Sequence, residues 1–198
     1  MSSRARLSDE QLDELLGLIK GADTVELKLT VPDADQRSTI AALGMDPLQA
    51  QIRQVFFFDT PQLTLNAVGV VARARRIQGR AGDTVVKLRP VVPDKLPPPL
   101  RKHPDFGVEV DAMPGGFVCS GSMKVEIDAA AATKSFTGQK SLKKVLSKDQ
   151  RAFYAEHAPV GVDLDSLSKM GPITVLKLKF TPPELERRMV AELSLIHI

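Results

Sequence analysis

Residues 70–90 read V-V-A-R-A-R-R-I-Q-G-R-A-G-D-T-V-V-K-L-R-P, two alternating segments on either side of a glycine-rich turn. This pattern predicts two β-strands, at 70–77 and 84–89, joined as a hairpin. Successive strand side chains point to opposite faces, so Arg73 and Arg75 share one face, as do Lys87 and Arg89. One carboxylate, Asp83, accompanies six cations: Arg73, Arg75, Arg76, Arg80, Lys87 and Arg89. Like charges repel, so this hairpin needs either a polyanionic ligand or carboxylates from elsewhere in the fold.

The composition narrows the class of protein. With 198 residues, 43% of them hydrophobic, the chain can bury one real core, and its net charge is only +3. A single cysteine, Cys119, excludes an internal disulfide and a cysteine-rich metal site, and the three histidines lack the spacing of zinc ligands. We find neither a signal peptide nor an apolar run of about 18 residues. These features predict a soluble, cytoplasmic protein with no membrane span.

The same alternation recurs in three further segments, at 24–31, 106–111 and 174–180. In each of them one face is apolar and the other is charged. The charged pairs at i and i+2 are Glu26 with Lys28, Glu109 with Asp111, and Lys177 with Lys179. A strand is also expected at 56–60, ahead of the basic hairpin, and the start of another at 189–193.

The remaining segments predict helices and loops. Ser8 and Gln11 form a capping box that begins a helix ending near Gly21, and further helices are expected at 33–43 and 141–157. Six prolines make 90–104 a loop. The low-pattern stretch 115–138 is expected to be a surface excursion.

Two architectures fit these strands. One is an antiparallel sheet with its charged face in water and helices on its back. The other is an antiparallel barrel with the charges inside and the helices outside. Several strands carry one sign of charge, whereas a solvated sheet usually mixes signs between neighbours, which favours the barrel. A charged interior must then be compensated by water, metal ions or a polyanion.

Several segments in order resemble the CYTH family, the triphosphate tunnel metalloenzymes. The matching segments are V-E-L-K, F-F-D-T-P, G-V-V-A-R-A-R-R, V-V-K-L-R-P, V-E-V-D, D-Q-R-A-F-Y and V-D-L-D. They run from about residue 24 to residue 192, and their order is more specific than any one of them. The resemblance implies an α+β fold: an eight-stranded antiparallel barrel, the triphosphate tunnel, with helices packed outside.

The resemblance also implies ligands and roles. A triphosphate is expected to bind Arg forks and Lys ammonium groups, while carboxylates hold Mg²⁺ or Mn²⁺. The metal ligands implied are Glu26, Glu109 and Asp111. The phosphate-binding residues implied are Lys28, Arg73, Arg75, Lys87, Arg89, Arg151, Lys177 and Lys179. Arg76 and Arg80 are expected in a solvated turn. Asp165 either matches an acidic position of the family motif or is an ordinary turn residue. Phe58 is expected in the core.

The chain departs from the family pattern in three ways. Thr24 stands where the first signature glutamate is expected, and Lys177 and Lys179 stand where many relatives carry acids. Third, the family pattern continues past residue 192, so we expect the tunnel domain to be incomplete at its C-terminus. We therefore divide the chain into an N-terminal helix (1–23), a tunnel domain (24–192) and a non-native tail (193–198).

Three functions follow as hypotheses. The first is metal-dependent hydrolysis of inorganic triphosphate, a nucleoside triphosphate or thiamine triphosphate. The second is a class IV type adenylate cyclase, although no adenine-reading residues are evident. The third is non-catalytic binding of polyphosphate or phosphorylated ligands. Nucleic-acid binding is a weaker alternative, because one Tyr and no Trp leave few aromatic side chains for base stacking.

Overall fold

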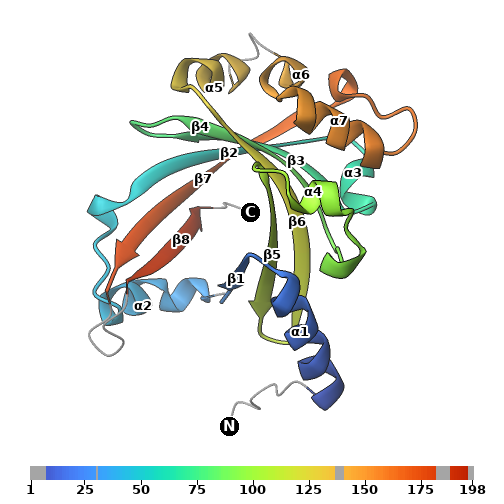
Figure 1. Cartoon of the computed structure of the whole chain (residues 1–198). Coiled ribbons are helices and arrows are strands. Elements are labelled where there is room, and N and C mark those ends of the chain that lie inside the picture. The colour runs from blue at the N-terminus through green and yellow to red at the C-terminus, as the bar shows by residue number, and fades with distance from the viewer. Residues whose placement is uncertain (1–7, 30, 137–140, 182–187, 196–198) are drawn as a thin grey trace.

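The computed structural model describes residues 8–29, 31–136, 141–181 and 188–195. Within these ranges the protein has an α+β fold, in which one eight-stranded sheet curls into a half-barrel with helices around it (Figure 1). Among the described helices, none has the length and apolar character needed to cross a lipid bilayer.

The strand order across the sheet is β1-β5-β6-β4-β3-β2-β7-β8, so β1 and β8 are its edges. All neighbouring pairs are antiparallel except β1 and β5, which run parallel. The bounds are β1 (Thr24–Leu27), β2 (Gln51–Asp59), β3 (Val70–Ile77), β4 (Gly82–Leu88), β5 (Phe106–Met113), β6 (Gly116–Ile127), β7 (Ser168–Phe180) and β8 (Met189–Leu195).

The helices are short, and several of them cover the convex side of the sheet. Figure 1 shows α5, α6 and α7 together outside the curl, with α1 beside β5 and α2 on the far side of the opening. The bounds are α1 (Asp9–Gly21), α2 (Gln36–Ala42), α3 (Thr64–Ala67), α4 (Pro98–Arg101), α5 (Ala129–Phe136), α6 (Leu142–Val145) and α7 (Lys148–His157). The short 3₁₀ turns are η1 (Asp33–Asp35), η2 (Pro47–Gln49), η3 (Pro93–Lys95) and η4 (Leu164–Ser166).

The hydrophobic core lies between this convex face and the helices. It contains the apolar members of the alternating strands, such as Val86, Val108 and Val110, which are almost fully buried. Helix α7 is fixed to the sheet at two points. The ring of Phe153 meets that of Phe106 edge-on at 5.7 Å, and the buried amide of Gln150 donates to the backbone oxygens of Thr84 and Met123. With one face filled by the core, the polar members of the same strands must face the opposite way.

Short sequence signals set the ends of several elements. The predicted capping box at Ser8 is present, with Ser8 Oγ accepting from Gln11 N, and Ser147 caps α7 in the same way. Asp59, at the end of β2, is buried, and its carboxylate accepts from the backbone amides of Thr60, Leu65 and Asn66. The aspartate of the F-D-T-P segment therefore holds the turn that leads into β3.

The structure corrects three details of the sequence prediction. The described part of 115–138, residues 115–136, is not an irregular excursion, because 116–127 form the interior strand β6 and 129–136 form α5. Small residues hid this strand: a Cβ at Gly121 would lie 2.8 Å from the Phe106 ring, so packing there excludes the bulky residues that mark a strand. The helix expected at 141–157 is divided into α6 and α7.

The third detail is the sheet itself, which is curled but open within the described residues, with β1 added in parallel. The parallel pairing is possible because the long connection from β1 to β5 includes β2, β3 and β4, which makes the return a crossover. Strand β8 pairs with β7 through Leu195, whereas residues 196–198 of the predicted tail lie outside the described residues.

Candidate functional site

The strand register places the charged side chains on the concave face. Paired residues share a face, and the pairs Glu26 with Asp111, Arg73 with Val85, and Lys177 with Glu192 lie opposite the core side. The ionisable residues brought to this face by the strands are Glu26, Arg53, Arg73, Arg75, Asp83, Lys87, Glu109, Asp111, Lys124, Glu126, Lys177, Lys179 and Glu192. The face therefore carries an acidic and a basic region, with apolar residues such as Val55, Val85 and Val175 between the charges.

The acidic region consists of the three residues predicted as metal ligands. Glu26 comes from β1, and Glu109 and Asp111 come from β5. One carboxylate oxygen of each lies within 4.8 Å of those of the others. Asp111 is fully buried: its Oδ2 faces the cations Lys28 and Arg89, whereas its Oδ1 has no hydrogen-bond partner, nor does the buried hydroxyl of Ser120. Three converging carboxylates, one of which has an unpartnered buried oxygen, are the donor set that Mg²⁺ and Mn²⁺ prefer, so the residues present fit such an ion.

Three cations line this cluster. Lys28 Nζ lies 2.9 Å from Asp111 and 3.5 Å from Glu26, and Lys87 Nζ lies 3.3 Å from Glu109. Arg89 Nη2 approaches Asp111 at 3.2 Å. Burial lowers the pKa of Lys28, but the hydrogen bond and charge of Asp111 outweigh that effect, so its pKa lies above the usual value. Lys28 is therefore held in its charged form.

A glycine positions Arg89. Gly69 has a φ of 74°, and a Cβ there would lie 2.0 Å from the backbone oxygen of Arg89. Without a side chain at this position, the backbone N–H of Arg89 donates to the Gly69 oxygen at 2.8 Å. This contact continues the β3–β4 pairing past Leu88 and keeps Arg89 beside Asp111.

The centre of the face is basic. Arg75 and Arg73 on β3 share one carboxylate, the buried Asp83 of β4. Arg75 makes the closer contact, with Nε 2.9 Å from Asp83 Oδ2, whereas Arg73 Nη2 is 3.8 Å from Oδ1. Burial, followed by the charge of Arg75, lowers the pKa of Arg73, and its Nε has no hydrogen-bond partner. One carboxylate for two guanidinium groups leaves Arg73 able to bind an anion.

The basic region extends to β2 and β7 through a residue that the sequence analysis missed. Arg53 is only 8% exposed; it contacts Glu192 at 2.8 Å and also donates to Gln51. Lys177 reaches the same Glu192 oxygen at 3.7 Å, and Lys179 is exposed nearby on the same face. Arg53 is the lone cation of β2, so the only sequence signal for it is its position two residues before Val55, which faces the same side.

Two residues assigned by resemblance lie elsewhere. Arg151 is on α7, over the convex face, where it donates to the backbone oxygens of Lys143 and Leu146. Asp165 pairs with Lys143 at 2.9 Å in the same helical layer. The structure thus places all the proposed site residues except Arg151 on the concave face, with Lys177 and Lys179 at the end away from the three carboxylates. Phe58 lies in the core, as expected.

This curled sheet, charged inside and covered by helices outside, is a CYTH-type triphosphate tunnel fold, as solved structures show. A candidate adenylyl cyclase from Hippeastrum, described as having a dominant triphosphatase activity, aligns with a TM-score of 0.54 and 17% identity. A candidate adenylate cyclase from Bacillus halodurans aligns with a TM-score of 0.53 and 10% identity. Each alignment covers 83% of this chain and 68% of the solved chain. No family model and no curated protein sequence matches the chain.

Proposed function

We propose that the protein binds a triphosphate on the concave face of its sheet and hydrolyses it with a divalent metal ion. The observation that carries this proposal is the adjacency of two oppositely charged groups on one face. Glu26, Glu109 and Asp111 converge within 4.8 Å, and Lys28 and Lys87 pair with them. Lys87 lies opposite Val71 of β3, on the face that also carries Arg73 and Arg75. Anionic phosphoryl oxygens and a divalent cation each find their preferred partners there.

The roles of the cations follow from their surroundings. Arg73 has spare hydrogen-bonding capacity and Arg75 is oriented by Asp83, so these guanidinium groups are suited to grip phosphoryl oxygens in fixed positions. Lys28, Lys87 and Arg89 are paired with carboxylates, and they can turn to phosphoryl oxygens once those carboxylates are neutralised. Positive charge on both sides of a phosphate chain stabilises the charge that develops on its leaving group.

A metal ion would be held by Glu26, Glu109 and Asp111. When bound, Mg²⁺ or Mn²⁺ supplies charge neutralisation at the phosphoryl oxygens and lowers the pKa of a bound water. Thr24, which pairs with Glu109 in register, contributes a neutral side chain where relatives are expected to have an acid. The donor set therefore comes from β1 and β5 alone, while Lys177 and Lys179 on β7 add positive charge.

Hydrolysis is favoured over cyclisation by the triphosphatase activity described for the Hippeastrum protein. Phosphate release from tripolyphosphate, ATP and thiamine triphosphate, each with Mg²⁺ or Mn²⁺, tests the proposal, and the same ATP reaction is assayed for cyclic AMP. We expect phosphate release that Glu109→Gln abolishes and Lys144→Gln, on the helical layer, leaves intact. Absence of release from all three substrates contradicts hydrolysis.

A second candidate, non-catalytic binding of a polyphosphate, is favoured by Lys177 and Lys179. Lys177 shares its carboxylate with Arg53, and Lys179 is exposed on the same face. This excess of positive charge strengthens anion binding without adding a metal ligand. Tight binding of tripolyphosphate in EDTA, with no turnover in either metal, would select this function over hydrolysis.

A further inference from the structure

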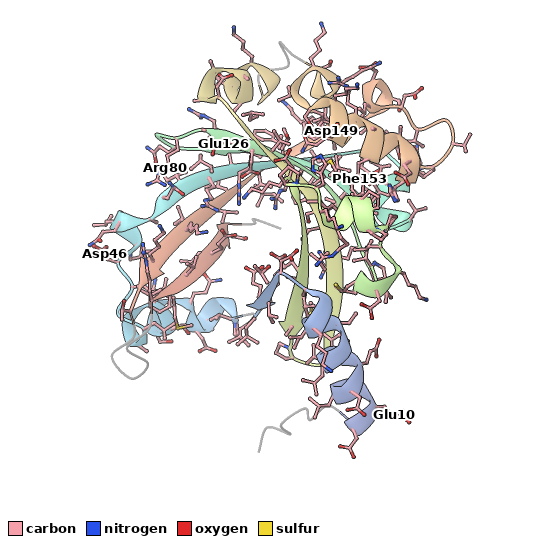
Figure 2. The ribbon with its side chains drawn as sticks, in the orientation of Figure 1. Glu10, Asp46, Arg80, Glu126, Asp149 and Phe153 are labelled. Atoms are coloured by element: carbon pink, nitrogen blue, oxygen red, sulfur yellow. The ribbon has the colours of Figure 1, made fainter. Side chains whose placement is uncertain are left out.

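A hollow lies at the end of the concave face away from the acidic cluster. Its volume is about 430 Å³, and it lies where the start of β2, the end of β7 and the β3–β4 turn meet. Four cations line it: Arg53, Arg80, Lys177 and Lys179. Figure 2 shows two lining residues, Arg80 and Asp46, on the side of the molecule away from Asp149 and Phe153 of the helical layer.

The positive charge of this hollow is only partly compensated. The carboxylate of Asp46 is already engaged by Leu48 N and by the side chain of Gln49. Glu192 serves both Arg53 and Lys177 through the same oxygen. The described residues provide no ion pair for Arg80 or Lys179. Burial, followed by the charge of Arg53, lowers the pKa of Lys177, which agrees with cations crowded around too few carboxylates.

The hollow is distinct from the acidic cluster. In register, Lys87 lies opposite Val71 of β3, and Arg53 lies opposite Ile77. Along β3, the position of Lys87 beside the acidic cluster and the position of Arg53 in the hollow are therefore six residues apart, a span of about 20 Å. This is longer than three phosphoryl groups in series. A triphosphate held at the acidic cluster and Arg73 would leave the hollow free.

We propose that the hollow is a second phosphoryl-binding subsite, independent of metal, formed by Arg53, Arg80, Lys177 and Lys179. Arg53 is buried and oriented by Glu192 and Gln51, so it supplies a fixed guanidinium group, and the other cations surround the space in front of it. The choice of a phosphoryl group as occupant rests on the proposed function. The group comes either from a polyphosphate chain that extends past Arg73 or from a free phosphate.

Binding measurements on the full chain in EDTA test this subsite. The probes are tripolyphosphate, a longer polyphosphate of defined length, and orthophosphate. The test variant is Arg80→Gln with Lys179→Gln, because both side chains are exposed and their loss leaves the core intact. The matched control is Lys144→Gln with Lys148→Gln, which removes the same charge from exposed positions on the helical layer. Thermal unfolding confirms that both variants fold.

We expect the longer chain to bind the wild type more tightly than tripolyphosphate does, and the test variant to lose about tenfold in its affinity for the longer chain. The control variant is expected to bind like the wild type. If the occupant is a free phosphate, orthophosphate is expected instead to shift the NMR signals of the backbone amides of 177–181. The test variant should abolish these shifts. Either result supports the subsite and assigns its source.

The subsite is overturned if the longer chain gains nothing over tripolyphosphate and orthophosphate shifts no amide near the hollow. It is also overturned if the control variant loses as much affinity as the test variant, since the effect would then be one of net charge. Failure of the proposed function gives a different result. In that case tripolyphosphate with Mn²⁺ shows no response to Glu109→Gln, whatever the hollow binds.

Discussion

The ammonium group of Lys28 lies 2.9 Å from the carboxylate of Asp111, which has no exposure to solvent. This pair joins the edge strand β1 to β5 and places a cation among the three carboxylates suited to a divalent metal. Lys28 and a metal ion therefore compete for the same oxygens. Metal binding would release the ammonium group, and a released Lys28 is available to an anionic ligand.

Because of this competition, Lys28→Gln is expected to change the affinities for metal and for phosphate in opposite directions. Without phosphate, the variant is expected to bind Mn²⁺ at least about tenfold more tightly, because a charge that repels the ion is gone. Its affinity for tripolyphosphate should fall about tenfold, because one charged contact is lost. Calorimetric titrations measure both constants, with Lys144→Gln as control. Unchanged Mn²⁺ affinity would show that Lys28 does not compete with the metal.

Asp83 holds the two arginines of β3 in place, so its removal should destabilise the protein. In Asp83→Asn two partly buried guanidinium groups lose their shared carboxylate, and we expect the free energy of unfolding to fall by about 3 kcal/mol. Tripolyphosphate should recover part of this loss, giving a larger ligand-induced rise in Tm than in the wild type. Urea and thermal unfolding measure both effects.

The exposed Asp94→Asn serves as the control for Asp83→Asn, with no expected change in stability. Equal ligand-induced rises in Tm for Asp83→Asn and the wild type would argue against the arginines of β3 as the anion site.

Tyr154 reports on the helical layer. Its hydroxyl donates to the backbone oxygen of Val162, and burial is the first cause that raises its pKa to about 12. Because it is the only tyrosine and there is no tryptophan, phenolate absorbance follows this residue alone. We expect ionisation near pH 12 in the native protein and near pH 10 after denaturation in urea.

The same shift has a consequence for stability. The folded-state pKa of Tyr154 is the higher one, so between about pH 10 and 12 the unfolded chain binds fewer protons than the folded one. The stability that this tyrosine contributes is complete below pH 10 and is lost as pH rises through this window. Tyr154→Phe should remove this part of the pH dependence. A native tyrosine that titrates near pH 10 contradicts the buried placement.

Much of the site was predictable because period-two alternation fixes which residues share a face. Glu109 with Asp111, Arg73 with Arg75, and Lys177 with Lys179 could be placed on one surface from spacing alone. Alternation does not tell which strands are neighbours in the sheet. The order of the motifs along the chain, through its resemblance to the CYTH family, was what indicated that these pairs form one site. The α+β architecture with a curled, charged sheet was predicted in this way and is confirmed.

The remainder depended on packing between distant segments. Strand β6 was missed because the small residues 119–122 interrupt its apolar alternation, and the Phe106 ring leaves no room for a side chain at Gly121. Arg53 was missed because its importance comes from Glu192, which is 139 positions away in sequence. Arg151 was assigned by motif, but its helix begins at a cap on Ser147 and packs on the convex side. Only the tertiary structure reveals such relationships.

Titration of tripolyphosphate, in the presence of Mn²⁺, into the wild type and into Arg73→Gln tests the central claim most directly. Asp83 retains Arg75 as its partner in this variant, so the fold is expected to persist. The predicted result is saturable one-to-one binding to the wild type and an affinity about tenfold lower for the variant. No binding to the wild type, or undiminished binding to Arg73→Gln, would contradict a triphosphate site on the concave face.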